Sequence, residues 1–121
     1  MNPPTPPATL AELTELANRF RDERNWRQFH NPKDAALSLT LEVAEILEHM
    51  QWKNGPELLE ALRANRSEFA DELADALYWI IVLADDLQID LGDAFKRKLL
   101  KNAQKYPIDK AKGQAKKYTE L

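Results

Sequence analysis

The sequence predicts an all-α fold, a four-helix bundle with a short connecting helix. In residues 34–51 and 68–87, apolar side chains recur at helical spacing, so each stretch should bury one broad face. Breaks that contain Pro, Gly or Asn separate these stretches from their neighbours. No segment has the alternating pattern of a half-buried strand, and no internal repeat is present.

The first helix should begin near Leu10, because Thr9 and Glu12 have the spacing of a capping box. We expect this helix to end around Arg24 or Asn25. The loop that follows, NWRQFHN, is unusually rich in aromatic side chains for a connection between two helices.

Asn31 and Pro32 should cap and open the second helix, which is expected to end near Gln51. We expect Gly55 to form the turn between the second helix and the connecting helix. Pro56 then opens the short connecting helix of about ten residues.

The long helix that contains residues 68–87 should begin at Asn65 or Ser67. A second break follows it, and the last helix is expected to start at Asp90 or Leu91. This helix should stop at residues 106–107, because proline disfavours the helical conformation of the residue before it.

The domain organisation follows from composition. The prolines near the N-terminus predict a disordered segment at residues 1–8, and residues 9–108 should form one domain. Residues 109–121 should be a basic, loosely packed tail. The basic last quarter of the chain is typical of a solvated helix face as well as of a nucleic-acid contact, and the acidic total charge favours the first interpretation.

Composition also excludes several classes of protein. The chain has no cysteine, which excludes disulfides and thiolate metal sites. No signal peptide and no segment apolar enough to span a bilayer is recognisable, so a cytoplasmic protein without membrane contact is expected.

The strongest functional signal is a pair of acidic residues on each of the two most apolar helices, Glu42 with Glu45 and Glu72 with Asp75. Neither helical stretch contains Lys or Arg, and like charges at this spacing destabilise an isolated helix by about 0.2–0.5 kcal/mol per pair. If the helices pack side by side, four carboxylates converge. Such oxygen ligands suit Mg²⁺, with Mn²⁺ as a substitute, better than zinc. From the pattern alone, a solvated acidic face is an equally good interpretation.

These two pairs resemble the E-x-x-E … E-x-x-D signature of the MazG-like nucleoside triphosphate pyrophosphohydrolases. The resemblance covers roughly residues 10 to 110 and is greatest to the dCTP pyrophosphatase branch. It extends to residues 22–32 before the first acidic pair, to residues 51–53 after it, and to residues 98–107 after the second pair.

The resemblance implies a role for particular side chains. It makes Glu42, Glu45, Glu72 and Asp75 the metal ligands and catalytic residues. The residues that it implies for nucleotide binding are Trp26, His30, Trp52, Lys53, Trp79, Lys98, Lys101 and Asn102. Within this set, the tryptophans would line the base pocket and the side chains from 98 to 102 would reach the triphosphate. His30 fits a partner that caps the loop as well as a wall of the pocket.

The implied activity is Mg²⁺-dependent hydrolysis of a (deoxy)nucleoside triphosphate to the monophosphate and pyrophosphate, as nucleotide house-cleaning. The implied substrate is dCTP or a related or modified pyrimidine nucleotide. Ala17 and Trp79 stand where the animal dCTP enzymes have His and Tyr, which puts a strict preference for dCTP in doubt. The alternatives are a non-catalytic nucleotide sensor and a helical interaction module.

The resemblance also implies a homodimer or homotetramer, and the apolar character of the helices in so short a chain agrees with it. The sequence leaves open the preferred base and sugar, the number of metal ions, and which carboxylate positions the attacking water.

Overall fold

A computed structural model describes residues 5–121, and within them it is all helical, so the predicted fold class is confirmed. The chain divides into two compact units, Met1–Gln88 and Ile89–Leu121. The helices are α1 (Leu10–Glu23), α2 (Pro32–Glu48), α3 (Gly55–Ala64), α4 (Arg66–Asp86), α5 (Leu91–Lys105) and α6 (Ile108–Ala111), with short 3₁₀ turns at Arg27–Phe29 and Tyr118–Glu120.

Polar side chains fix the starts of three of these helices. The Thr9 hydroxyl accepts a hydrogen bond from the backbone N–H of Glu12 at the start of α1. The Asn31 and Asp90 side chains accept equivalent bonds at the starts of α2 and α5. Each bond satisfies an N–H group that has no partner within its own helix. These boundaries agree with those predicted from sequence.

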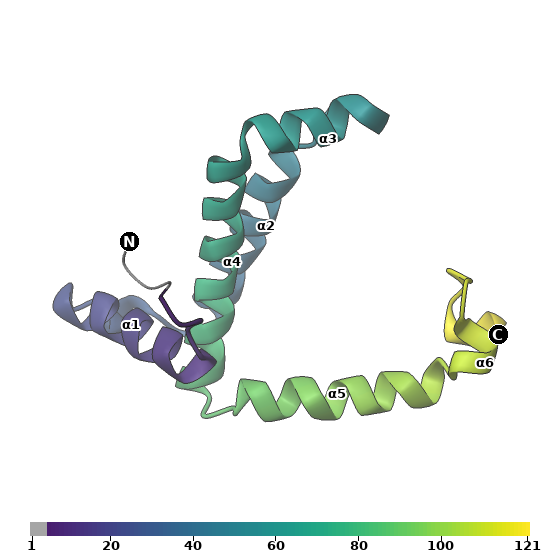
Figure 1. Cartoon of the computed structure of the whole chain (residues 1–121). Coiled ribbons are helices and arrows are strands. Elements are labelled where there is room, and N and C mark those ends of the chain that lie inside the picture. Colours follow the sequence, from purple (N-terminus) through teal and green to yellow (C-terminus); the bar gives the residue numbers. More distant parts are fainter. Residues whose placement is uncertain (1–4) are drawn as a thin grey trace. The chain divides into compact units, whose positions relative to one another are not determined.

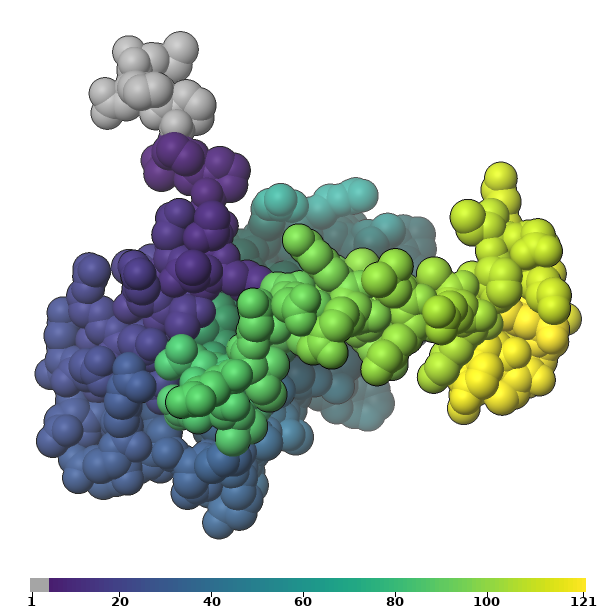
Figure 2. All heavy atoms as spheres, turned by 90° about the horizontal axis from the view of Figure 1, so that it is seen from below, coloured from purple at the N-terminus to yellow at the C-terminus, as the bar shows by residue number. Residues whose placement is uncertain are grey.

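In the first unit, α2 packs along α4, and α1 crosses the C-terminal end of α4 (Figure 1). The two long helices run antiparallel, because His30 before α2 meets Trp79 while His49 after α2 meets Phe69. The space-filling view shows α1, in purple, next to the start of α2, in blue (Figure 2). The small buried core lies at this junction and consists of Ala17, Ala35, Ile81, Val82 and Ala84.

The apolar face of α4 is less buried than the periodicity predicts. Leu73, Leu77 and Ile80 remain 49%, 38% and 37% exposed, although their spacing placed them on the buried side. Only the last turns of the helix are enclosed by both α1 and α2. Within the first unit, α1 and α2 therefore leave a stripe of apolar side chains along α4 uncovered.

Two boundaries differ from the predictions. Helix α2 ends at Glu48, three residues before the expected end, and the chain turns through Trp52, whose φ of 69° is left-handed. Gly55, expected in the turn, is the first residue of α3 and has a φ of 52°. A residue without a side chain adopts that angle without steric cost.

The second unit contains α5, α6 and the C-terminal 3₁₀ turn. Tyr118 packs edge to face on Tyr106, with ring centroids 6.0 Å apart, and the Lys105 ammonium lies 4.8 Å from the Tyr118 ring. Short helical turns thus lie in the predicted tail, and its loose packing stays a prediction. The predicted disorder of residues 1–8 falls in part on residues 1–4, outside the described residues. No helix within residues 5–121 is long and apolar enough to cross a membrane.

Candidate metal and nucleotide site

Three of the four predicted metal ligands come together between α2 and α4. Glu42 and Glu45 lie one turn apart on α2, and Glu72 comes from the facing side of α4. One carboxylate oxygen from each lies within 4.8 Å of the other two. The i, i+3 spacing on antiparallel partners is what brings these side chains to one place.

The electrostatics of this cluster are unfavourable without a cation. Burial, the neighbouring Glu45 carboxyl and the charge of Asp75 raise the pKa of Glu42 from 4.5 to about 7. Contact with Glu45 and partial burial likewise raise the pKa of Glu72. One oxygen of Glu42 and one of Glu72 are buried without a hydrogen-bond partner. Carboxylates crowded in this way hold protons, or they bind a cation.

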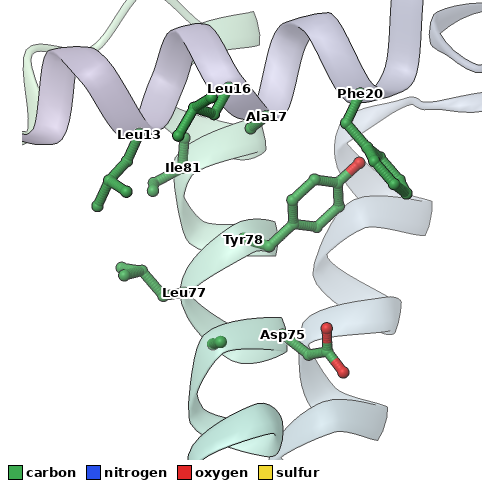
Figure 3. A pocket seen from close by; sticks show the side chains of 9 residues that line it. Leu13, Leu16, Ala17, Phe20, Asp75, Leu77, Tyr78 and Ile81 are labelled. Atoms are coloured by element: carbon green, nitrogen blue, oxygen red, sulfur yellow. The ribbon is translucent and has the colours of Figure 1, made fainter. Parts of the chain in front are cut away.

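The fourth acid, Asp75, is adjacent to the cluster but outside it. Its charge contributes to the raised pKa of Glu42, so it lies within electrostatic reach. Figure 3 shows its carboxylate extending from α4 on the side that faces α2. Its predicted role as a metal ligand stays a prediction.

The residues present fit a divalent cation. The donor set is all carboxylate oxygen, the class of ligand that Mg²⁺ and Mn²⁺ prefer. The two buried oxygens without partners have the chemistry of open ligand positions. His49 is the one basic side chain paired with the cluster in the described residues, with its Nε2 3.9 Å from Glu72 Oε1.

A cavity of about 420 Å³ begins beside this cluster and continues between α4 and α1. Asp75 is the acid at its edge, and the remaining lining is mostly apolar. Figure 3 shows the Tyr78 ring between the two helices, with its hydroxyl toward Phe20. That hydroxyl is buried without a partner. The lining residues are Leu13, Leu16, Ala17, Phe20, Ala74, Asp75, Leu77, Tyr78 and Ile81.

Five aromatic side chains form a continuous row at this end of the unit, which we call the aromatic row. It consists of Trp26, Phe20, Tyr78, Trp79 and His30, and neighbouring ring centroids lie 5.1 to 6.1 Å apart in edge-to-face contacts. The row contains three of the predicted nucleotide-binding residues, Trp26, Trp79 and His30, next to Phe20 and Tyr78, which sequence reasoning did not single out. The spacing of Tyr78, one turn after Asp75, was the available signal.

His30 is one end of this row. Its ring meets Trp79 at 5.2 Å, and its Nδ1 is buried without a partner. Burial, together with the nearby Arg21 charge, lowers the pKa of its imidazole. The two interpretations of His30 that the sequence left open, a partner that caps the loop and a wall of the pocket, both stay predictions.

Trp52 and Lys53 lie at the opposite end of the α2–α4 pair from the aromatic row. They follow the end of α2, where His49 meets Phe69. Phe69 precedes Trp79 by ten residues on α4, a rise of ~15 Å along a helix. Trp52 is 88% exposed. One copy of the first unit therefore does not bring Trp52 and Trp26 into one base-sized pocket.

The remaining predicted residues, Lys98, Lys101 and Asn102, lie on α5 in the second unit. Both lysines are exposed and Asn102 is half-buried. Their predicted contact with the triphosphate stays a prediction.

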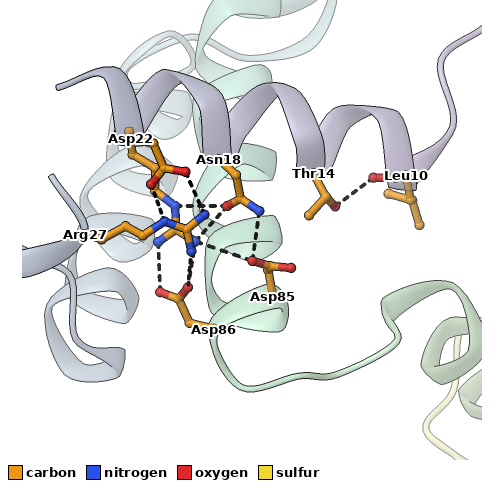
Figure 4. A network of polar contacts seen from close by, with 8 residues as sticks. Leu10, Thr14, Asn18, Asp22, Arg27, Asp85 and Asp86 are labelled. Atoms are coloured by element: carbon orange, nitrogen blue, oxygen red, sulfur yellow. Dashed lines mark hydrogen bonds and ion pairs between the residues drawn. The ribbon is translucent and has the colours of Figure 1, made fainter. Parts of the chain in front are cut away.

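A second polar cluster, at the end of α4, was not anticipated (Figure 4). Arg21 of α1 is completely buried and binds both carboxylate oxygens of Asp86. Asn18 joins Arg21 to Asp85. In sequence, Arg21 stands among exposed charges of α1 and carries no signal of burial.

Known proteins resemble this chain over most of its length. Rat and human dCTP pyrophosphatase 1 are each 36% identical to it over 121 residues, which cover 97% of this chain and 70% of the relative. A pyrophosphatase crystal structure from Archaeoglobus fulgidus superposes with a TM-score of 0.78 and 37% identity, covering 88% of this chain and 99% of that one. A model of the MazG-like family matches residues 37–121. The chain belongs to the MazG-like family.

Proposed function

We propose that this protein is a divalent-metal-dependent enzyme that hydrolyses a (deoxy)nucleoside triphosphate to the monophosphate and pyrophosphate. The predicted enzyme class, a nucleoside triphosphate pyrophosphohydrolase, is confirmed by the relatives named dCTP pyrophosphatase and by the archaeal pyrophosphatase. The observation that carries the metal requirement is the group of three carboxylates with ligand oxygens within 4.8 Å.

The proposed site assigns the four acids to one task. Glu42, Glu45, Glu72 and Asp75 would hold the cation, preferably Mg²⁺. A bound divalent cation neutralises phosphate charge and lowers the pKa of a coordinated water. Whichever carboxylate keeps a free oxygen accepts the proton of the attacking water. Lys98, Lys101 and Asn102 are proposed to bind the phosphates.

We place the base against the aromatic row, next to Asp75. Aromatic stacking contributes ~1–3 kcal/mol per base in nucleic-acid systems. Ala17 lines the cavity in place of the larger His of the dCTP branch, so the cavity offers room for a base substituent. We therefore propose dCTP or a related, modified pyrimidine nucleotide as the substrate, in a house-cleaning role. The cytoplasmic location stays a prediction.

We also propose that the protein acts as a homo-oligomer. Leu73, Leu77 and Ile80 of α4 leave apolar surface exposed, as do Leu37 and Leu41 of α2 at 57% each. Exposed stripes of this kind are typical of interfaces. The separation of Trp52 from Trp26 supports the same proposal, because a pocket that contains both requires two copies. Light scattering at micromolar concentration should give at least a dimer mass, and a monomer mass would contradict the proposal.

The decisive experiment is a hydrolysis screen over canonical and modified triphosphates with product identification. In Mg²⁺ we expect monophosphate and pyrophosphate as the products, with lower activity on nucleotides whose base is not a pyrimidine. In EDTA we expect no hydrolysis. Orthophosphate with a nucleoside diphosphate would contradict the mechanism. A sensor would instead bind nucleotide without turnover. An interaction module would show no thermal shift with Mg²⁺ plus nucleotide, whereas a ligand that binds the folded state stabilises it.

A further inference from the structure

Arg21 is the one fully buried charged side chain in the described residues, at 0% exposure. Its Nη1 and Nη2 donate to the two carboxylate oxygens of Asp86 at 2.9 and 2.6 Å. Its Nε and Nη2 also donate to Asn18 Oδ1 at 3.1 and 2.8 Å. Asn18 in turn donates to Asp85 at 3.0 Å. The buried guanidinium is therefore bound along its planar edges by two partners.

Stability alone does not account for such an arrangement. Removing the Arg21 charge completely and the Asp86 charge in large part from water is costly, and apolar residues of similar volume often serve a fold equally well. A bidentate guanidinium–carboxylate pair contributes directional geometry, because its paired hydrogen bonds restrict the relative orientation of the two groups. The Arg21–Asp86 pair fixes α1 against the last turn of α4 in one orientation.

The segment that follows α1 contacts both members of this pair, Arg21 through its backbone and Asp86 through its side chain. The backbone carbonyl of Arg21 accepts the N–H of Trp26 at 2.9 Å, while Asn25 between them is left-handed, with a φ of 54°. Arg27 binds the Asp22 carboxylate through two nitrogens, and its Nη1 lies 3.8 Å from Asp86. Asp86 thus contacts the arginines on both sides of the turn that carries Trp26.

This segment contains Trp26, one end of the aromatic row, and is followed by His30, the other end. Trp26 is 41% exposed and meets Phe20 at 5.6 Å. His30, at the end of the 3₁₀ turn that begins with Arg27, meets Trp79 at 5.2 Å. Within the row, the Tyr78 hydroxyl and His30 Nδ1 have no hydrogen-bond partner among the described residues. Arg24 contacts the Phe20 and Trp26 rings at 3.9 and 5.9 Å through its charge alone. The adjoining network, in contrast, contains directional hydrogen bonds.

We infer that Arg21, through its bidentate pair with Asp86, is a positioning residue that sets Trp26 and His30 for recognition of the base, without taking part in the phosphate chemistry. The inference rests on the proposed function, since it assumes that the aromatic row receives the base. The pair lies at the C-terminal end of α4 and binds α1. The carboxylate cluster lies nearer the N-terminal end of α4, at Glu72, and faces α2. Base recognition and hydrolysis are therefore separable by substitution.

The test compares three variants with the parent enzyme: Arg21→Lys, Asp86→Asn, and the double variant Arg21→Met/Asp86→Leu. The double variant replaces both charges with apolar groups, so it leaves no unpaired buried charge and should keep the fold. Arg19→Lys is the matched control, because Arg19 is an exposed arginine on the same helix. For each folded protein, kcat and KM are measured over a panel of triphosphates that differ only in the base.

We expect the double variant to raise KM for the preferred nucleotide by about tenfold, with kcat within about twofold of the parent. The ratio of kcat/KM between the best and the worst base should narrow toward one. Arg19→Lys should match the parent. A purely structural role predicts a lower Tm with unchanged KM and unchanged base ratio below the melting range, and that result would overturn the inference. A fall in kcat at constant KM would overturn it as well.

A second measurement does not depend on activity. In a background with Trp52→Phe and Trp79→Phe, Trp26 is the only tryptophan, and its quenching by acrylamide reports its exposure. The charge-pair variants should at least double the quenching constant relative to the parent background. An unchanged constant would refute the positioning role. If the parent hydrolyses no triphosphate, the proposed function fails, and the quenching result still decides whether Arg21 positions Trp26.

Discussion

Helix α4 carries two groups of acids in opposite electrostatic conditions. At its end, Asp86 is bound by Arg21, and this contact lowers the pKa of the Asp86 carboxyl. In its middle, Glu72 faces Glu42 and Glu45, and contact with Glu45 raises the pKa of the Glu72 carboxyl. Both groups are acidic pairs on a helix that carries no Lys or Arg after Arg66, its first residue. Only the first group is paired with an arginine from a neighbouring element, whereas Glu72 has His49 as its basic neighbour.

The difference separates structural acids from ligand-binding acids. A carboxylate that the fold has already neutralised has its hydrogen-bonding capacity in use, as Asp86 does with both oxygens. A carboxylate that keeps a buried oxygen without a partner, as Glu42 and Glu72 do, retains capacity for an external cation. The comparison predicts that the two groups respond in opposite ways to substitution, to pH and to metal.

The largest expected effect is on turnover. Changing Glu42, Glu45, Glu72 or Asp75 to the corresponding amide should lower kcat/KM by about a hundredfold or more, because each loss weakens metal binding worth several kcal/mol in the transition state. The losses should not add, since the four act as one unit. Without metal, the amide variants should melt at or above the temperature of the parent, because mutual repulsion is relieved. Steady-state kinetics and thermal melts in EDTA measure both effects.

Two acids on the same helices are matched controls. Glu48 on α2 and Asp71 on α4 are exposed and lie outside both motifs, so their amide variants should keep parental activity. Asp85 is unsuitable as a control, because it accepts a hydrogen bond from Asn18 and lies in the Arg21 network. Equal sensitivity at Glu48 and Glu45 would contradict the site assignment.

The second effect is on stability at the other acidic group. Arg21→Met alone should lower the free energy of unfolding by ~3 kcal/mol, the lower end for breaking a buried pair, since the Asp86 side chain keeps 29% exposure. Arg21→Met/Asp86→Leu should recover most of this loss, because Asp86 no longer leaves an unpaired carboxylate, and Asp85, 3.6 Å from Arg21 in the parent, keeps its hydrogen bond from Asn18. Chemical denaturation of the three proteins measures it. A double variant as unstable as the single one would show that the pair itself stabilises the fold.

Helix starts and fold class were predictable because they depend on local chemistry. Thr9, Asn31 and Asp90 cap their helices through side chains within three residues, which a sequence pattern records directly. The burial of the α4 face was not predictable in the same way. Periodicity identifies an apolar side, but whether Leu73 and Leu77 are covered depends on what packs there, and in the first unit α1 and α2 cover them only in part.

The candidate site was likewise predictable where it depends on the spacing of residues within helices. The spacing of Glu42, Glu45 and Glu72 gave the cluster, since antiparallel neighbours bring such pairs together. Arg21 was missed because charge patterns do not reveal which arginine a later helix will cover. The separation of Trp26 from Trp52 was missed because a shared role in a family does not state whether two residues act within one copy.

The third prediction concerns pH in the absence of metal. The Glu42 carboxyl has a pKa of about 7 in the folded chain, above its ordinary value of 4.5. Between these values the unfolded chain releases a proton that the folded chain retains, so the cluster destabilises the fold as pH rises from 4.5 to about 7. Thermal melts in EDTA should show a Tm decrease over this window that is smaller in Glu42→Gln.

The Arg21 network has the opposite sign. The Asp86 pKa is lowered, so its contribution to stability is present above its ordinary pKa of 3.8 and is lost as pH falls through the folded-state value. In Asp86→Asn, the decrease of Tm at the acidic limit should be weaker than in the parent, and the Glu42 window should be unchanged. A coupled response of the two regions would contradict their independence.

The smallest effect on stability is expected at Trp52, which contacts neither the carboxylate cluster nor the Arg21 network. A left-handed non-glycine residue costs roughly 1–2 kcal/mol, and a side chain that is 88% exposed gains little from burial in one chain. Trp52→Gly should therefore raise the unfolding free energy of the separated subunit by ~1 kcal/mol, measured by denaturation at concentrations below oligomer formation. The same change should raise KM for nucleotide with little change in kcat, because the ring is proposed to stack on the base in a pocket completed by a second copy. A lower subunit stability would instead place Trp52 among the residues that hold the fold.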